Sequence, residues 1–192
     1  MKKVLLAVAI VAAGFTANAQ DVKFGAKAGL NFANVYGDDV ENNDYRTSLH
    51  VGAVAEIEIS EKFSLQPELM YSTQGAKTDE NNVDLTMKLD YLNVPVMAKY
   101  YVAEGFSLEA GPQVGFLLSA KVKAESGGDS GEVDVKDEFE TIDFGLNFGA
   151  GYKLDSGLNF SARYNLGLSN VAKESDNSIK NGVFQVSVGY FF

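Results

Sequence analysis

The chain has 192 residues, enough for one domain, and 26 acidic against 16 basic side chains give it a net charge of −10. This acidity argues against nucleic acid as a partner, because nucleic-acid-binding surfaces are basic. With no cysteine and one histidine, the chain has no disulfide framework and no histidine or thiolate metal cluster, and we expect no cofactor. Hydrophobic residues make up 46% and the mean hydropathy is −0.07, which fits a soluble domain or a β-barrel.

The N-terminus is typical of a secretory signal peptide. Two lysines precede an apolar run from Val4 to Phe15, and an Ala-x-Ala cleavage site ends at Ala19, before Gln20. The run is too short for a membrane-spanning helix, which needs roughly 20 residues. We therefore expect a signal peptide over residues 1–19 and one mature domain over residues 20–192, whose charge falls to −12 on loss of the two lysines.

After residue 20, apolar side chains recur at every second position, the period of a strand with one apolar face. In the first expected strand, Phe24 and Leu30 share one face and Lys27 lies on the other. Polar loops are expected at 34–46, 75–83, 121–140 and 169–181, with tight turns between them. In chain order the pattern predicts eight strands, over residues 22–33, 47–59, 62–74, 84–101, 106–118, 141–152, 158–168 and 183–192.

The fourth expected strand, 84–101, changes phase. Apolar residues alternate on odd numbers from Leu85 to Leu89 and on even numbers from Leu92 to Tyr100. If both series face outward, a β-bulge near Tyr91 is the simplest explanation.

The sixth expected strand, 141–152, shows most clearly what each face meets. Its even positions are all apolar or aromatic, and its odd positions are all polar or glycine. A small membrane barrel has lipid outside and a narrow interior that holds small, polar side chains. A lipocalin-like soluble barrel would reverse the faces, but the glycines on the polar row favour the membrane barrel: Gly29, Gly52, Gly111, Gly145, Gly149 and Gly151.

Connections alternate between long and short, as in outer-membrane barrels with external loops and periplasmic turns. We therefore predict an all-β fold, an eight-stranded antiparallel up-and-down transmembrane β-barrel in outer-membrane lipid. The chain ends in an outward-facing aromatic residue, Phe192, through which we expect the barrel-assembly machinery to recognise it. An aromatic girdle is expected at the periplasmic interface, formed by Phe24, Phe63, Tyr100, Phe106, Tyr152 and Tyr190.

Several stretches resemble the small outer-membrane barrel proteins of Bacteroidetes, a porin-family group that includes PorT-related β-barrel domains. They are Leu89–Tyr100, Gly111–Ala120 and Asp143–Tyr152, together with the Ala19-Gln20 junction and the terminal Gly189–Phe192. The resemblance spans nearly all of the mature chain and implies the same fold and location. Similarity to the PorT branch would imply a part in protein secretion.

The inward row carries ionisable side chains that are costly at membrane depth unless paired. The interior of an eight-stranded barrel is only wide enough for side chains to fill. These groups are therefore expected to form a structural plug of ion pairs and not a conducting path. The expected lumen ion network comprises Lys23, Lys27, Glu56, Glu58, Glu68, Lys99, Glu109, Asp143 and Arg163.

His50 lies on the inward phase with Ser48 two residues before it, and some eight-stranded barrels are lipid-modifying enzymes. Without a visible partner constellation we expect His50 to be part of the plug, and we predict neither catalytic nor metal-binding residues. The acidic loops at Asp38–Asp44 and Asp129–Glu140 lack the spacing of a calcium loop, so we expect a solvated surface there.

The leading hypothesis is a structural or surface-interaction barrel whose external loops meet protein partners. One alternative is a PorT-like accessory of protein secretion or transport. The other is a lipid-modifying outer-membrane enzyme.

Overall fold

The computed structural model describes residues 22–37, 44–80, 83–127, 129–173 and 178–192. The expected signal peptide lies outside the described residues, as do residues 38–43 of the loop expected at 34–46, whose other residues belong to the first two strands. Among the described residues, no helix is long and apolar enough to cross a membrane. The elements are β1 (Val22–Gly37), β2 (Asp44–Ser60), β3 (Phe63–Glu80), β4 (Val83–Ala103), β5 (Phe106–Ser126), β6 (Asp129–Asp134), the 3₁₀ helix η1 (Lys136–Glu138), β7 (Ile142–Lys153), β8 (Leu158–Gly167) and β9 (Ile179–Phe191).

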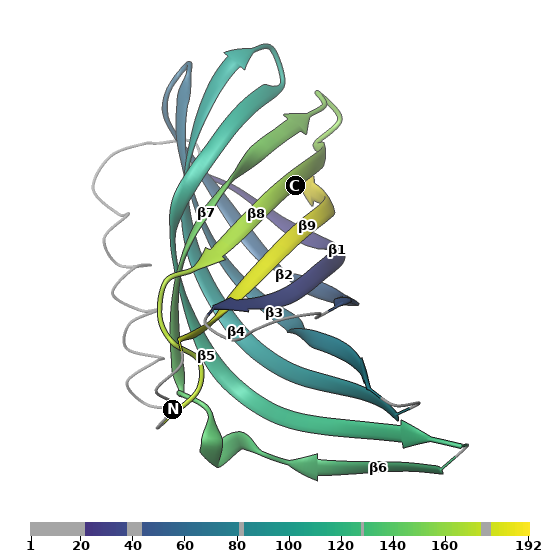
Figure 1. The fold of residues 1–192 in the computed structure, drawn as a ribbon. Coiled ribbons are helices and arrows are strands. Elements are labelled where there is room, and N and C mark those ends of the chain that lie inside the picture. The colour runs from purple at the N-terminus through teal and green to yellow at the C-terminus, as the bar shows by residue number, and fades with distance from the viewer. Residues whose placement is uncertain (1–21, 38–43, 81–82, 128, 174–177) are drawn as a thin grey trace.

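Eight of these strands close into a ring (Figure 1). The order β4-β3-β2-β1-β9-β8-β7-β5 is completed by pairing of β4 with β5, and every pair is antiparallel. The predicted eight-stranded up-and-down barrel is therefore confirmed. Strand β6 lies outside the ring and, in the described part of the chain, pairs only with β5.

The two faces of the ring are those of a membrane protein. On β7, Phe144 is 53% and Phe148 46% exposed, whereas Asn147 between them is fully buried. This inverts the burial of a soluble protein, in which apolar residues are enclosed. The lipocalin-like alternative, with the apolar row lining a cavity, is therefore wrong.

A register irregularity lies where the β-bulge was predicted, but the two apolar series of β4 do not share a face. From Leu89 to Lys99 the odd-numbered residues of β4 are buried, so Leu89 points inward, not outward. Asp90 pairs with Ser119 and Tyr91 with Leu117, which places the extra residue, Leu118, on β5. The strand continues without turning over, with its odd-numbered residues facing inward. The apolar residues of β4 lie on the inward face as far as Leu89 and on the outward face from Leu92 onward, because the medium around the strand changes there.

Two expected loops are largely strand. β3 and β4 stay paired as far as Glu80 and Val83, which replaces the loop at 75–83. β5 continues to Ser126 and returns as β6, which replaces much of the loop at 121–140. Valines that alternate with charged residues continue the period of two in this segment, and cross-strand ion pairs support it. We call residues 75–80, 83–90, 119–126 and 129–134 the outer extension, because they project beyond the ring (Figure 1).

Candidate functional site

Glu68 is the centre of a buried ionic cluster inside the ring. Its carboxylate accepts hydrogen bonds from Lys27 Nζ at 2.8 and 2.9 Å and from the Arg163 guanidinium at 2.8 and 3.0 Å. Gln66 Nε2 donates a further bond at 2.7 Å. The three charged side chains are at most 6% exposed. Two cations thus share one carboxylate, which leaves a positive charge for the next acid to balance.

Glu109 and Glu56 continue the cluster. Glu109 lies 3.1 Å from Arg163 Nη2 and 3.6 Å from Lys99 Nζ. Lys99 Nζ lies 3.5 Å from Glu56 and donates to Gln66 Oε1 at 3.0 Å. Cations and anions alternate along this series of contacts, so that each buried charge lies next to its opposite.

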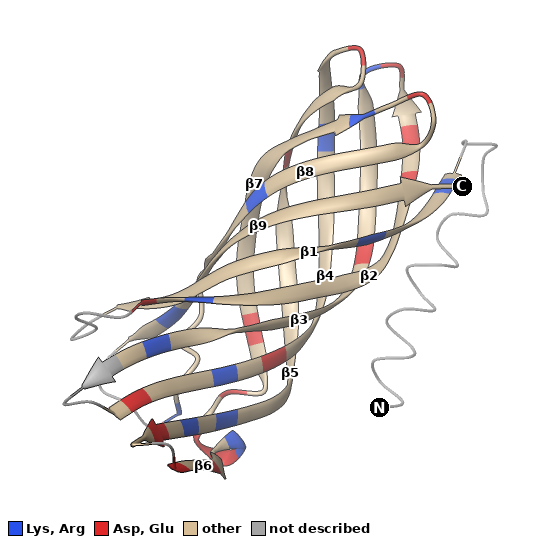
Figure 2. Ribbon diagram, turned by 90° about the vertical axis from the view of Figure 1, so that its right-hand side faces the viewer, with Lys and Arg blue, Asp and Glu red and all other residues tan. Residues whose placement is uncertain are grey.

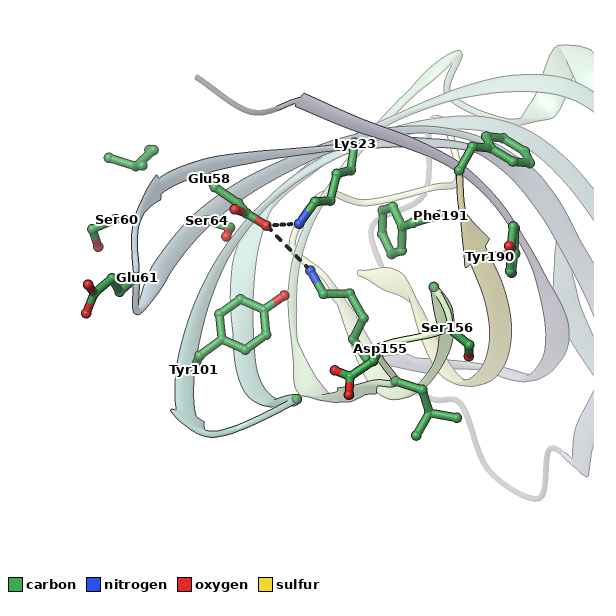
Figure 3. A pocket seen from close by; sticks show the side chains of 16 residues that line it. Lys23, Glu58, Ser60, Glu61, Ser64, Tyr101, Asp155, Ser156, Tyr190 and Phe191 are labelled. Atoms are coloured by element: carbon green, nitrogen blue, oxygen red, sulfur yellow. Dashed lines mark hydrogen bonds and ion pairs between the residues drawn. The ribbon is translucent and has the colours of Figure 1, made fainter. Parts of the chain in front are cut away.

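The series ends at an open mouth on the short-turn side of the ring. Lys153 Nζ lies 2.9 Å from Glu56 and 3.9 Å from Glu58, and Lys23 Nζ lies 2.5 Å from Glu58. A hollow of about 760 Å³ opens here, with Tyr101 facing it (Figure 3). We call the whole series the lumen ion chain: Lys23, Glu58, Lys153, Glu56, Lys99, Glu109, Arg163, Glu68 and Lys27.

Eight of the nine residues expected in the network are joined in this chain, and the ninth, Asp143, is not. Asp143 accepts hydrogen bonds from Ser169 Oγ at 2.7 Å and Asn181 Nδ2 at 2.9 Å, near the other end of the ring. Sequence reasoning missed Lys153 because it was assigned to a turn. The signal was present, since Lys153 continues the odd-numbered inward series of β7.

His50 connects three strands. Its Nδ1 lies 2.7 Å from Asn31 Oδ1 and its Nε2 lies 2.8 Å from Ser187 Oγ, whereas Ser48 donates instead to the Thr73 carbonyl. The Asn31 amide nitrogen donates to other acceptors, so the Asn31 amide oxygen faces the His50 imidazole. Since this oxygen can only accept, Nδ1 of His50 carries the imidazole proton. Nε2 then accepts from the Ser187 hydroxyl. This relay is the geometry of a nucleophilic serine site, but His50 is 2% and Ser187 7% exposed.

Gly29 makes this arrangement possible. It pairs with His50 on one side and Ser187 on the other. A Cβ at Gly29 would lie 2.8 Å from His50 Cε1 and 2.1 Å from the Val186 oxygen. The imidazole therefore crosses β1 over a position that has no side chain.

The structure brings together no metal-ligand set among the residues it describes: no group of three histidine, cysteine, aspartate or glutamate side chains could hold an ion. Of the two acidic loops considered for calcium, residues 38–43 lie outside the described part. The second, 129–140, is strand β6 followed by η1. The enclosed space beside His50 is about 10 Å³, near the size of one water molecule.

Residues 18–173 match a family described as the outer membrane protein beta-barrel domain. The chain belongs to this family. No curated protein matches it. Among solved structures it is similar to Ail, the attachment invasion locus protein of Yersinia pestis, at 16% identity and TM-score 0.56, over 90% of this chain and 99% of Ail. It is also similar to neisserial surface protein A, at 12% identity and TM-score 0.51, over 91% and 100%. These likenesses show the fold.

An outer-membrane barrel carries its short turns on the periplasmic side. The lumen ion chain then opens toward the periplasm, and the outer extension projects outside the cell. The six residues of the expected girdle are all exposed, and they pair at or near this end of the ring, as in Phe63 with Tyr100 and Phe106 with Tyr152.

The outer extension has one charged and one apolar face. Lys88, Lys121 and Glu132 lie on the same face of three adjacent strands, with Glu132 2.7 Å from Lys88 Nζ and 2.8 Å from Lys121 Nζ. Hydrogen bonds from Lys121 and then Lys88 lower the pKa of Glu132 to about 2. On the other face, Val133 is 64% exposed. Figure 2 shows charged residues gathered along this part of β5 and on β6.

Proposed function

We propose that this protein is a closed outer-membrane barrel that acts through surface interactions at its outer strands and loops, and that it neither conducts solutes nor catalyses a reaction. The observation that carries the proposal is the lumen ion chain. Each of its charges has an opposite partner within 4 Å, from the periplasmic mouth to Lys27.

Pairing of this kind supports a structural role. A buried ion whose partner is removed is left uncompensated, at a cost of about 3–5 kcal/mol, so the members of the chain hold one another in place. To pass through the lumen, hydrated ions would have to displace side chains such as Glu68, which accepts hydrogen bonds from both Lys27 and Arg163. In the same proposal, the expected aromatic girdle contacts lipid at the membrane interface, and the terminal Phe192 is the residue that the assembly machinery recognises.

The test is conductance in planar bilayers. We expect no stable open pore from the wild type. The triple variant Lys27→Ser, Glu68→Ser and Arg163→Ser removes the buried inner end of the lumen ion chain, and we expect it to pass small ions if it still shows heat-modifiable migration on a gel. A reproducible open pore in the wild type would overturn the proposal.

A second candidate function, lipid-modifying acyl transfer, is favoured by one observation, the relay from Asn31 through His50 to Ser187. Its nucleophile, Ser187, is buried, and the space beside His50 holds about one water. We therefore expect a fluorophosphonate probe not to label Ser187 in the folded barrel. Labelling that is lost in Ser187→Ala would establish the enzyme instead. No observation in the described residues favours a PorT-like role in secretion.

The surface partner is expected to differ from that of Ail, which has been crystallised with the heparin analogue sucrose octasulfate. Acidic side chains predominate on β6 and η1 here. A polyanion would be repelled by such a surface, so we expect a partner with basic groups.

A further inference from the structure

Among the residues that the structure describes, strand β6 leaves one edge of the sheet unpaired, which matters because an open edge is a template for another strand. Within the same residues, β6 is the last strand in the sheet order and pairs only with β5 (Figure 1). All six of its residues are exposed. The ring itself offers no such edge, because it closes on itself.

The register identifies the backbone groups at the open edge. Ser126 pairs with Asp129, and Val135 N–H donates to the Ala120 carbonyl at 3.0 Å. In an antiparallel ladder hydrogen-bonded and non-hydrogen-bonded pairs alternate, so Asp129, Gly131 and Val133 bond to β5. The backbone N–H and C=O groups that point away from β5 belong to Ser130, Glu132 and Asp134. These three donors and three acceptors repeat every second residue, roughly 7 Å apart.

The side chains beside this edge define what could pair there. Glu132 and Asp134 lie on the charged face, next to where an incoming strand would place alternate side chains. Gly131 and Val133 lie on the apolar face, which continues into Met87 and Val122. A segment that alternates basic and apolar residues matches both faces.

From this we infer that the free edge of β6 is a docking site for an extended basic-apolar segment of another protein, which pairs with the backbone of Ser130, Glu132 and Asp134. The inference rests on the proposed surface role and names its partner class. A second copy of this chain does not fit, because two β6 strands side by side would bring their acidic residues together. A sulfated polyanion does not fit for the same reason.

The decisive variants are Ser130→Pro and Ser130→Ala. Proline removes the N–H that points to the free edge and leaves the β5 ladder intact, because residue 130 makes no ladder bond, and proline is tolerated on edge strands. Alanine keeps that N–H and serves as the matched control. Asp134→Asn removes a charge and keeps an Oδ1 that can accept from the Lys136 backbone N–H, as the Asp134 carboxylate does at 3.0 Å.

The experiment measures fluorescence anisotropy of a labelled Lys-Val repeat heptapeptide against the full barrel in nanodiscs, with a Glu-Val heptapeptide as control. We expect the basic peptide to bind better than the acidic one. We expect Ser130→Pro to weaken binding about fivefold or more, as loss of a hydrogen bond does, and Ser130→Ala to change it less than about twofold. Asp134→Asn should weaken binding modestly.

Equal binding by Ser130→Pro and Ser130→Ala would overturn the inference, since it would mean adsorption by charge without strand pairing. Absence of binding by the wild type would overturn it too. Neither outcome bears on the closed barrel, which the conductance measurement decides separately.

Discussion

The ring and the outer extension share the same strands and the same period of two, but their faces have opposite contents. In the ring, Lys99 points inward and Tyr100 outward. Farther along β4, Met87 and Leu89 share the inward face and Lys88 the outward one. The change lies near Tyr91 on β4 and Leu118 on β5. The comparison teaches that alternation specifies a strand, while the medium on each side decides which face is apolar: lipid around the ring, water around the outer extension.

The largest effect is expected inside the ring, from Glu68→Ala. It leaves Lys27 and Arg163 buried beside each other without their shared carboxylate, and we expect a loss of about 3–5 kcal/mol in unfolding free energy. The matched control is Glu58→Ala at the periplasmic mouth, where the side chain is 35% exposed and the loss should be below about 1 kcal/mol. Urea unfolding in liposomes, followed by heat-modifiable migration, measures both. Equal losses would contradict the buried chain.

A smaller effect is expected from Phe148→Lys. Phe148 is 46% exposed at mid-strand in β7, and a lysine on the lipid face near the bilayer midplane costs about 2–4 kcal/mol. Val133→Lys makes a matched change in the outer extension, where Val133 is 64% exposed to water, and should be nearly neutral. The same unfolding assay compares them, and a neutral Phe148→Lys would place that face in water.

The two regions should also differ in their tolerance of an added methyl group. Gly29→Ala places a Cβ against the Val186 oxygen and the His50 ring, so we expect a loss of about 1–3 kcal/mol. Gly131→Ala on β6 meets nothing within 4 Å and should be neutral or stabilising by up to about 1 kcal/mol. Thermal unfolding of each variant measures the change in stability. Similar changes in Tm for the two variants would mean that the His50 side chain does not pack closely over Gly29.

The sequence was sufficient for the ring because a period of two fixes which side chains share a face. It placed Lys27, Glu68 and Arg163 inside without indicating that they meet. Which inward groups meet depends on the register across several strands, and this is why Lys27 contacts Glu68 on β3 while Glu56 on β2 bonds to Lys99 and Lys153. The relay through His50 needs β9 beside β1, which only closure of the ring provides. Within the outer extension, residues 84–90 were predicted as strand, but 75–80 and most of 119–134 were missed because their polar composition was interpreted as loop, although the alternation continued.

The smallest expected effect concerns the charged face of the outer extension. The pKa of Glu132 is lowered from 4.5 to about 2, so its ion pairs contribute fully above about pH 4.5 and are lost as the pH falls toward 2. Glu132→Gln at neutral pH removes the same contacts from Lys88 and Lys121. Hydrogen exchange of the β5–β6 amides should therefore rise in Glu132→Gln at pH 7, after correction for intrinsic rates, while exchange in the ring stays unchanged. Glu125→Gln, which removes a single contact from Lys123, should raise it less. If exchange rose in the ring as well, the two regions would unfold together and the outer extension would not be a separate unit.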